Sequence, residues 1–118
     1  MKVLVCGSRS YDNWEYIFAR IEDIHKETPI TEIIHGAAKG VDSWAGLWAR
    51  RNSIQENRYP ADWEGHGKAA GPIRNRRMLD EGKPDLVMGF LTPESKGTRN
   101  MLEQAHKAGV KCIVHHIV

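Results

Sequence analysis

Residues 32–49, EIIHGAAKGVDSWAGLWA, pass from an apolar run through a turn of very small residues directly into a helical pattern. The run around Ile33 and Ile34 predicts a strand over 32–35 that ends at Gly36. Apolar residues then recur at helical spacing at Val41, Trp44, Ala45, Trp48 and Ala49. This stretch therefore predicts a strand, a tight turn and a helix that packs back on the sheet.

The same order of strand and helix continues through the rest of the chain. Short apolar runs predict further strands at residues 3–6, 54–59, 85–91 and 110–118. Helical spacing predicts further helices from Asp12, with Asp12 and Glu15 as a capping box, from Pro72 to about Glu81, and over 101–108, with a loop over 61–71. The alternation predicts the α/β class, with one doubly wound, mostly parallel, Rossmann-like sheet, helices on both faces, and a single domain over 1–118.

Composition restricts the class of protein. The chain has 118 residues, 41% of them hydrophobic and 27% charged, with a net charge of +2. These values are typical of a globular domain and too weakly basic to require a nucleic acid partner. Cys6 and Cys112 lie in predicted strands and are expected to be reduced. With no predicted signal peptide or membrane span, we expect a cytoplasmic protein without a membrane partner.

Three predicted turns share small residues, polar groups and cations beside a helix start. Because the carboxyl ends of parallel strands lie at one edge of the sheet, these turns are expected to converge. Glycine permits close approach of backbone N–H groups to an anion, and a helix N-terminus attracts negative charge. The turns supply as candidate ligand contacts Gly7, Ser8, Arg9, Gly36, Ala37, Lys39, Gly40, Gly97, Thr98, Arg99 and Asn100.

The helix that begins near Pro72 adds two further candidates. Arg74 and Asn75 lie four residues before Met78 and Leu79, which are expected to face the sheet. Both polar residues should therefore face inward at the ligand edge, where a buried arginine needs an anionic or hydrogen-bonding partner.

Asp42 and Trp63 each permit two interpretations. Asp42 lies in the first turn of its helix, where it would either cap the turn or contact the ligand. Trp63 would either stack on a base or anchor its loop. The six histidines show no metal-ligand spacing, and no dinucleotide or P-loop motif is present, so we predict no metal and no cofactor.

Five motifs carry a resemblance that covers essentially the whole chain. They are GSRSY (7–11), GAAKGVD (36–42), YPADW (59–63), AGPIRNRRM (70–78) and KGTRNM (96–101). Together they resemble the SLOG superfamily of Rossmann-like domains, which includes Smf DNA-processing proteins and LOG phosphoribohydrolases, and specifically its YspA-like, YpsA-related branch.

The resemblance to LOG enzymes implies roles for particular residues. Arg74 matches their catalytic arginine, and Gly97 and Thr98 match their phosphate-binding pair. Their catalytic glutamate is replaced here by Met101. Glu103 cannot substitute for it, since two residues along a helix turn the side chain by about 200°. The resemblance thus implies that the phosphate site is retained without the acid, and whether any bond is cleaved stays open.

Three hypotheses follow. The favoured one is a sensor or sequestering protein that binds a nucleotide-derived, phosphorylated small molecule. The second is a LOG-like phosphoribohydrolase or other N-glycosidic or phosphate-bond hydrolase that uses Asp42, Asp62 or Glu94 as its acid. The third is Smf-like binding of single-stranded DNA, against which the modest net charge argues. Oligomeric state also stays open, with Trp44 and Trp48 marking the candidate surface for a homodimer.

Overall fold

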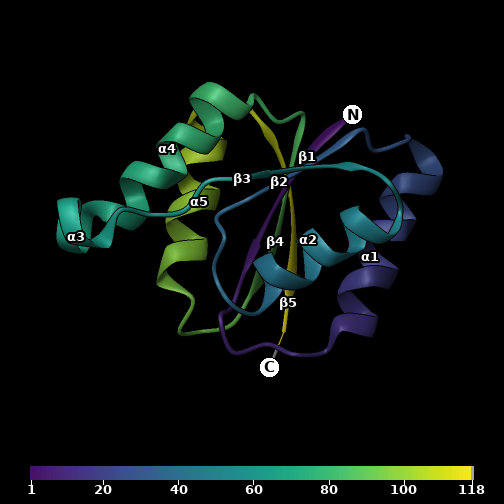
Figure 1. The fold of residues 1–118 in the computed structure, drawn as a ribbon, viewed down its shortest axis with the longest axis horizontal. Helices are drawn as coiled ribbons and strands as arrows, with labels where there is room; N and C mark the ends of the chain where they lie inside the picture. The colour runs from purple at the N-terminus through teal and green to yellow at the C-terminus, as the bar shows by residue number, and fades with distance from the viewer. Residues whose placement is uncertain (118) are drawn as a thin grey trace.

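A five-stranded parallel sheet forms the centre of the molecule. The computed structural model describes residues 1–117 (Figure 1). The strands are β1 (Lys2–Gly7), β2 (Glu32–His35), β3 (Gln55–Arg58), β4 (Leu86–Leu91) and β5 (Lys111–His116). They lie in the order β3-β2-β1-β4-β5, and every neighbouring pair is parallel. The predicted fold class is confirmed.

Two layers of helices cover the sheet. The helices are α1 (Trp14–Glu27), α2 (Val41–Arg51), α3 (Trp63–His66), a 3₁₀ turn (Gly67–Ala69), α4 (Ala70–Gly82) and α5 (Lys96–Lys107). Figure 1 shows the sheet nearly edge-on, with α1 and α2 on one side and α4 and α5 on the other. No helix within residues 1–117 has the length and apolar character needed to span a bilayer.

Each face of the sheet has its own hydrophobic core, because successive strand side chains point to opposite faces. In β1, Val3 and Val5 pack in the core under α1 and α2, whereas Leu4 and Cys6 pack in the core under α4 and α5. Trp48 of α2 is buried in the first core, and its indole N–H donates to Glu22 at 2.9 Å. Trp48 is therefore a core residue, and its prediction as part of a dimer surface is wrong.

Two helix starts differ from the prediction. The cap of α1 is Asn13 rather than Asp12, since the Asn13 side chain accepts a hydrogen bond from the Tyr16 N–H at 3.2 Å. The predicted loop over 61–71 contains α3, in which Asp62 accepts from the Gly65 N–H, and the beginning of α4. A short polar segment has no apolar periodicity, so its helical turn depends on this one cap.

The strand order creates a crevice at the carboxyl end of the sheet. From β1 the chain builds outward through β2 to β3, then crosses to the opposite face and enters β4 on the other side of β1. The connections that follow β1 and β4 consequently leave toward opposite faces. The space between them is where open α/β sheets bind ligands.

Candidate functional site

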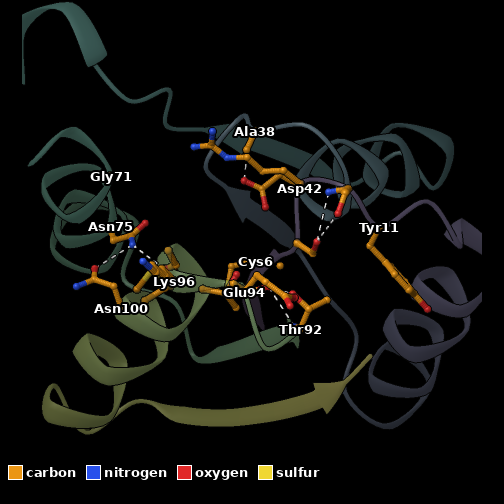
Figure 2. A pocket seen from close by; sticks show the side chains of 18 of the residues that line it. Cys6, Tyr11, Ala38, Asp42, Gly71, Asn75, Thr92, Glu94, Lys96 and Asn100 are labelled. Carbon is orange, nitrogen blue, oxygen red and sulfur yellow. Dashed lines mark hydrogen bonds between the residues drawn. The ribbon is translucent and has the colours of Figure 1, made fainter. Parts of the chain in front are cut away.

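A cavity of about 1240 Å³ occupies this crevice. Figure 2 shows its wall built from three directions: Ala38 and Asp42 lie on one side, Asn75 and Asn100 come from α4 and α5, and Thr92 belongs to the connection after β4. The elements that form it are far apart in the sequence and meet because the strands are parallel. The predicted convergence of turns at one edge therefore occurs in the structure.

Most of the predicted contacts line this cavity or a smaller neighbour. The large cavity is lined by Gly7, Ser8, Arg9, Asp42, Trp63, Arg74, Asn75, Gly97, Thr98 and Asn100. An adjacent cavity of about 410 Å³ is lined in part by Gly36, Ala37 and Lys39, and shares Arg9, Ala38, Trp63 and Arg74 with the first. Gly40 and Arg99 line neither cavity. Arg99 instead donates to the Thr92 carbonyl at 3.4 Å.

Arg74 is the most firmly held cation of the site. One Nη donates to the carbonyl of Gly36 at 2.5 Å, and Nε donates to Oδ1 of Asn75 at 3.0 Å. Burial lowers the pKa of Arg74, while the nearby Asp42 carboxylate acts in the opposite direction. A guanidinium keeps its charge in proteins, so a positive charge is fixed between the two cavities. The predicted inward orientation of Arg74 agrees with the structure.

Asn75 positions Arg74 and joins two helices. Its Oδ1 accepts from Arg74, and its Nδ2 donates to the Gly97 carbonyl at 3.3 Å and to Oδ1 of Asn100 at 3.1 Å. Gln104 of α5 also donates to Asn100, at 2.8 Å. Since both ends of its amide are engaged, Asn75 is a positioning residue that connects the start of α4 to the start of α5.

The turn between β2 and α2 is held by acceptors within the protein. Oδ2 of Asp42 accepts from the N–H groups of Gly36 and Ala38 at 3.0 and 3.3 Å. Nδ1 of His35 accepts from the Ala37 N–H at 3.0 Å, and its Nε2 lies 2.6 Å from Glu56. These three N–H groups are therefore not free for a ligand. Gly36 and Ala37 stay candidate contacts only through the cavity surface that they form.

Two glycines of this turn are required by geometry. A Cβ on Gly36 would overlap the guanidinium of Arg74. Gly40 has a φ of +72°, and a Cβ there would overlap the main chain of Ser8 and Arg9. The small residues after Ile34 thus let an arginine side chain and the β1–α1 connection approach the backbone closely.

Unlike the β2–α2 turn, the connection between β4 and α5 leaves N–H groups without acceptors in the described part of the chain. Ser95 does not cap α5, because its hydroxyl pairs with that of Thr92 at 2.7 Å. Among the hydrogen bonds formed within residues 1–117, none uses the N–H of Gly97 or Thr98. This helix therefore presents free N–H groups beside the large cavity, an arrangement that favours an anion.

Charges around the cavities are unevenly paired. Four cations (Arg9, Lys68, Arg74 and Lys96) and three acids (Asp12, Asp42 and Glu94) line the large cavity. Within the described chain none of these cations has a carboxylate oxygen within 4.0 Å, whereas the exposed neighbours Arg76 and Arg77 on α4 pair with Asp80 and Glu81. The lining cations are thus available to a negatively charged ligand.

Three side chains determine what chemistry the cavity can perform. Met101 is fully buried where the LOG resemblance places a glutamate. Burial, and secondly the charge of Asp42, raise the pKa of the Cys6 thiol, so it is protonated at neutral pH and a poor nucleophile. Asp42 lines the cavity with Oδ1 unengaged among the described residues, and burial raises the pKa of its carboxyl. Residues 1–117 contain no cluster of three or more metal-binding side chains.

Several lining residues were not among the predicted contacts. They are Cys6, Ser10, Tyr11, Asp12, Ala38, Lys68, Gly71, Pro72, Met78, Thr92, Pro93, Glu94, Ser95, Lys96 and Met101. Ser10 and Tyr11 directly follow predicted contacts in the β1–α1 connection, so their position in the chain was a usable signal. Cys6 and Met78 are core residues whose exposure to the cavity no pattern distinguishes from simple burial, whereas the resemblance to LOG enzymes had already placed Met101 at a site position.

Comparisons with known proteins agree with this architecture. The chain is 34% identical over 118 residues to the Gene 61 protein of Mycobacterium phage D29, an alignment that covers 95% of this chain and 94% of the phage protein. Its fold is similar to that of DNA processing protein A (DprA) from Streptococcus pneumoniae, with a TM-score of 0.77 and 19% identity. That match covers 96% of this chain but 49% of DprA, so the chain spans about half of the DprA length.

A family model provides the assignment. The model for YAcAr, the YspA, cpYpsA-related SLOG family, matches residues 1–66, more than half of the 118 residues. The matched part includes β1, β2 and the two turns that hold Gly7 and Gly36. The phage relative extends the similarity through α4 and α5. From its sequence and its fold, the chain belongs to the YspA, cpYpsA-related SLOG family.

Proposed function

We propose that the chain binds a nucleotide-derived, phosphorylated small molecule in the cavity at the carboxyl ends of β1 and β4, and acts as a sensor or sequestering protein. The observation that carries this proposal is the Arg74 guanidinium, held by Gly36 and Asn75 and without a carboxylate partner among the described residues. A half-buried cation that faces a cavity and forms no ion pair favours an anionic ligand.

The surroundings of Arg74 support a phosphate in particular. The unused N–H groups of Gly97 and Thr98 lie at the start of a twelve-residue helix. Ser8 and Thr98, which carry hydroxyl groups, line the same cavity, and the Ser8 hydroxyl also pairs with that of Ser10 at 3.2 Å. Cation, free amides and hydroxyls are the groups that proteins use around phosphate oxygens.

Binding is favoured over hydrolysis. The acid of the LOG pattern is absent at Met101, and the Cys6 thiol is protonated. Asp42 is the one buried acid that lines the cavity, and one of its oxygens accepts two backbone hydrogen bonds. Incubation with nucleoside monophosphates, followed by chromatography, tests the hydrolytic alternative. Release of free base or ribose phosphate would support that alternative and contradict a purely binding role.

The proposal is tested by calorimetric titration with nucleotides, ADP-ribose derivatives and cyclic dinucleotides. We expect at least one to bind, and we expect Arg74→Ala to weaken its binding about tenfold or more, since a charged hydrogen-bonding partner is lost. Arg76→Ala is the matched control, because Arg76 is an exposed arginine two residues away on the same helix. Absence of binding across the panel, or equal loss in both variants, would contradict the proposal.

The fold similarity to DNA processing protein A supports DNA as the second candidate ligand, and the resemblance to Smf proteins specifies single-stranded DNA. Arg9, Lys39 and Lys68, which line the two cavities, could contact successive phosphates. A mobility-shift titration at two salt concentrations tests it, because binding driven by phosphate contacts weakens steeply as salt increases. Binding that is insensitive to salt would exclude this mode.

A further inference from the structure

The smaller cavity differs from the larger one in its charge. Its lining contains three cations, Arg9, Lys39 and Arg74, and no aspartate or glutamate. Its volume of about 410 Å³ lies within the range of about 300–1,000 Å³ that is typical of ligand sites. The cavity is therefore a strongly cationic compartment with room for a ligand group of its own.

Trp63 stands at the boundary between the two cavities. It lines both, as do Arg9 and Arg74. Trp63 is 49% exposed, and the Arg9 guanidinium lies over its ring at 5.2 Å from the ring centroid. An exposed indole offers a π-face on which nucleic acid bases stack, and a nearby cation compensates phosphate. Arg9 lies over the ring itself, so a base would stack on the part of the ring that Arg9 leaves uncovered.

The position of Trp63 is fixed by its neighbours. Asp62 caps the short helix that begins with Trp63 by accepting from the Gly65 N–H at 2.9 Å. Gly71 lies close to the outer edge of the indole, where even a Cβ would be in ordinary contact at 3.5 Å. The ring therefore rests against the start of α4 by its edge, and about half of its surface stays open.

We propose that the ligand consists of two phosphate-linked nucleosides, with a base stacked on Trp63 and a phosphate in the cationic cavity beside Lys39. This inference rests on the proposed function, in which the large cavity takes a phosphorylated group near Arg74. A mononucleotide in the large cavity can compensate Arg9 and Arg74, which line both cavities, but it leaves Lys39 of the smaller cavity uncompensated. A ligand that extends past Trp63 would place phosphates near both Arg74 and Lys39.

The test is calorimetric titration with three probes: ribose 5-phosphate, AMP and the linear dinucleotide pApA. We expect the wild-type protein to bind pApA most tightly. Trp63→Ala should weaken pApA about fivefold or more and leave ribose 5-phosphate unchanged, whereas Trp63→Phe, which retains a ring, should stay within about twofold of wild type. Trp63 is half-exposed, so these variants are expected to fold, and circular dichroism verifies this.

Lys39 distinguishes the two cavities in a binding experiment, because it lines only the smaller one. We expect Lys39→Gln to weaken pApA about threefold and AMP not at all, since one exposed charge contributes modestly. Lys26→Gln is the matched control, because Lys26 is an exposed lysine in the last turn of α1 and lines neither cavity.

The outcomes distinguish this inference from the proposed function. Binding of pApA that depends on Arg74 but is unchanged in Trp63→Ala and Lys39→Gln would overturn the two-nucleoside ligand and leave the proposed function standing. Absence of binding for all three probes and for the nucleotide panel would overturn both. An octanucleotide that binds more tightly than pApA and protects more than two nucleotides would overturn the short ligand in favour of a nucleic acid strand.

Discussion

The β2–α2 turn and the β4–α5 turn look alike in sequence and behave differently in the structure. Each places glycine and small or polar residues at the start of a helix or directly before it. In the first, Gly36, Ala37 and Ala38 donate their N–H groups to His35 and Asp42. In the second, the N–H groups of Gly97 and Thr98 have no acceptor among residues 1–117.

Asp42 accepts two of the three engaged N–H groups of the first turn, and His35 accepts the third. Asp42 lies in the first turn of α2 and folds back on the turn that precedes it. The first turn of α5 contains no acid, and the hydroxyl of Ser95 is engaged with Thr92. The N–H groups of Gly97 and Thr98 at the start of α5 are therefore without an acceptor in the described chain, because neither its own first turn nor the preceding connection supplies one. The N–H groups of the β2–α2 turn are engaged within the protein, whereas these two are free of any bond to the described residues and lie beside the large cavity.

The largest expected effect on stability comes from removing the acceptor of the β2–α2 turn. Asp42→Ala leaves the N–H groups of Gly36 and Ala38 without an acceptor, at about 1–3 kcal/mol for each buried donor. We expect the free energy of unfolding to fall by about 3 kcal/mol in urea titrations. Asp42→Asn retains an acceptor oxygen and is the matched control. Equal stability of wild type and Asp42→Ala would show that the turn does not need its acid.

The substitution Gly36→Ala in the same turn should displace Arg74 and weaken ligand binding. In Gly36→Ala the new Cβ overlaps Arg74, so the guanidinium must move. We expect a loss of about 1–3 kcal/mol in stability, the usual cost of overpacking. Calorimetry should also show about tenfold weaker binding of an anionic ligand, since a charged hydrogen-bonding partner is displaced. Unchanged affinity would mean that Arg74 binds the ligand from another position.

The pH dependence of stability reports on the same acid. Burial raises the pKa of the Asp42 carboxyl above its ordinary value of 3.8. The folded protein then holds this proton more tightly than the unfolded chain does. The contribution of Asp42 to stability is therefore fully present below about pH 3.8 and is lost as pH rises through the folded pKa.

Asp42→Asn isolates that contribution, because every other titrating group is retained. We expect the free energy of unfolding of the wild type to decrease relative to Asp42→Asn as the pH of the urea titrations increases from about 4 to about 7. Parallel curves for the two proteins would show that Asp42 ionises normally in the folded state.

The smallest effect on stability is expected at the start of α5. A Cβ added at Gly97 would have no atom within 4 Å, and Gly97 does not have a positive φ, so Gly97→Ala fits without displacement. Alanine favours a helix over glycine by up to about 1 kcal/mol, and we expect a correspondingly small increase in stability. Thermal unfolding of Gly97→Ala beside Gly36→Ala compares one substitution in two turns. A decrease in both would remove the distinction between them.

Sequence patterns were sufficient for the architecture, because apolar runs and helical spacing report directly on burial. Ile33 and Ile34 are fully buried in β2, and Met78 and Leu79 pack toward the sheet as predicted. Trp48 shows the limit of such patterns: its spacing places it on the apolar face of α2, but only the structure distinguishes core from interface.

The site was predictable in outline for a different reason. Parallel strands bring their carboxyl ends together, so turns that follow Gly7 and Gly36 must lie near each other. The direction of each N–H group depends on acceptors several residues away, such as Asp42 for Gly36, and no local pattern encodes it. The pairing of Arg9 with Trp63 joins residues from distant parts of the chain and was likewise beyond sequence analysis.

The amide of Asn75 has a consequence for the energetics of recognition. It ties the second turn of α4 to the start of α5 and holds the Arg74 side chain, which also reaches across to Gly36. Freezing a long, flexible side chain ordinarily costs about 0.5–1.5 kcal/mol when a complex forms. Here that conformational entropy is lost during folding instead, so binding of an anionic ligand to the preorganised guanidinium would not require this loss again.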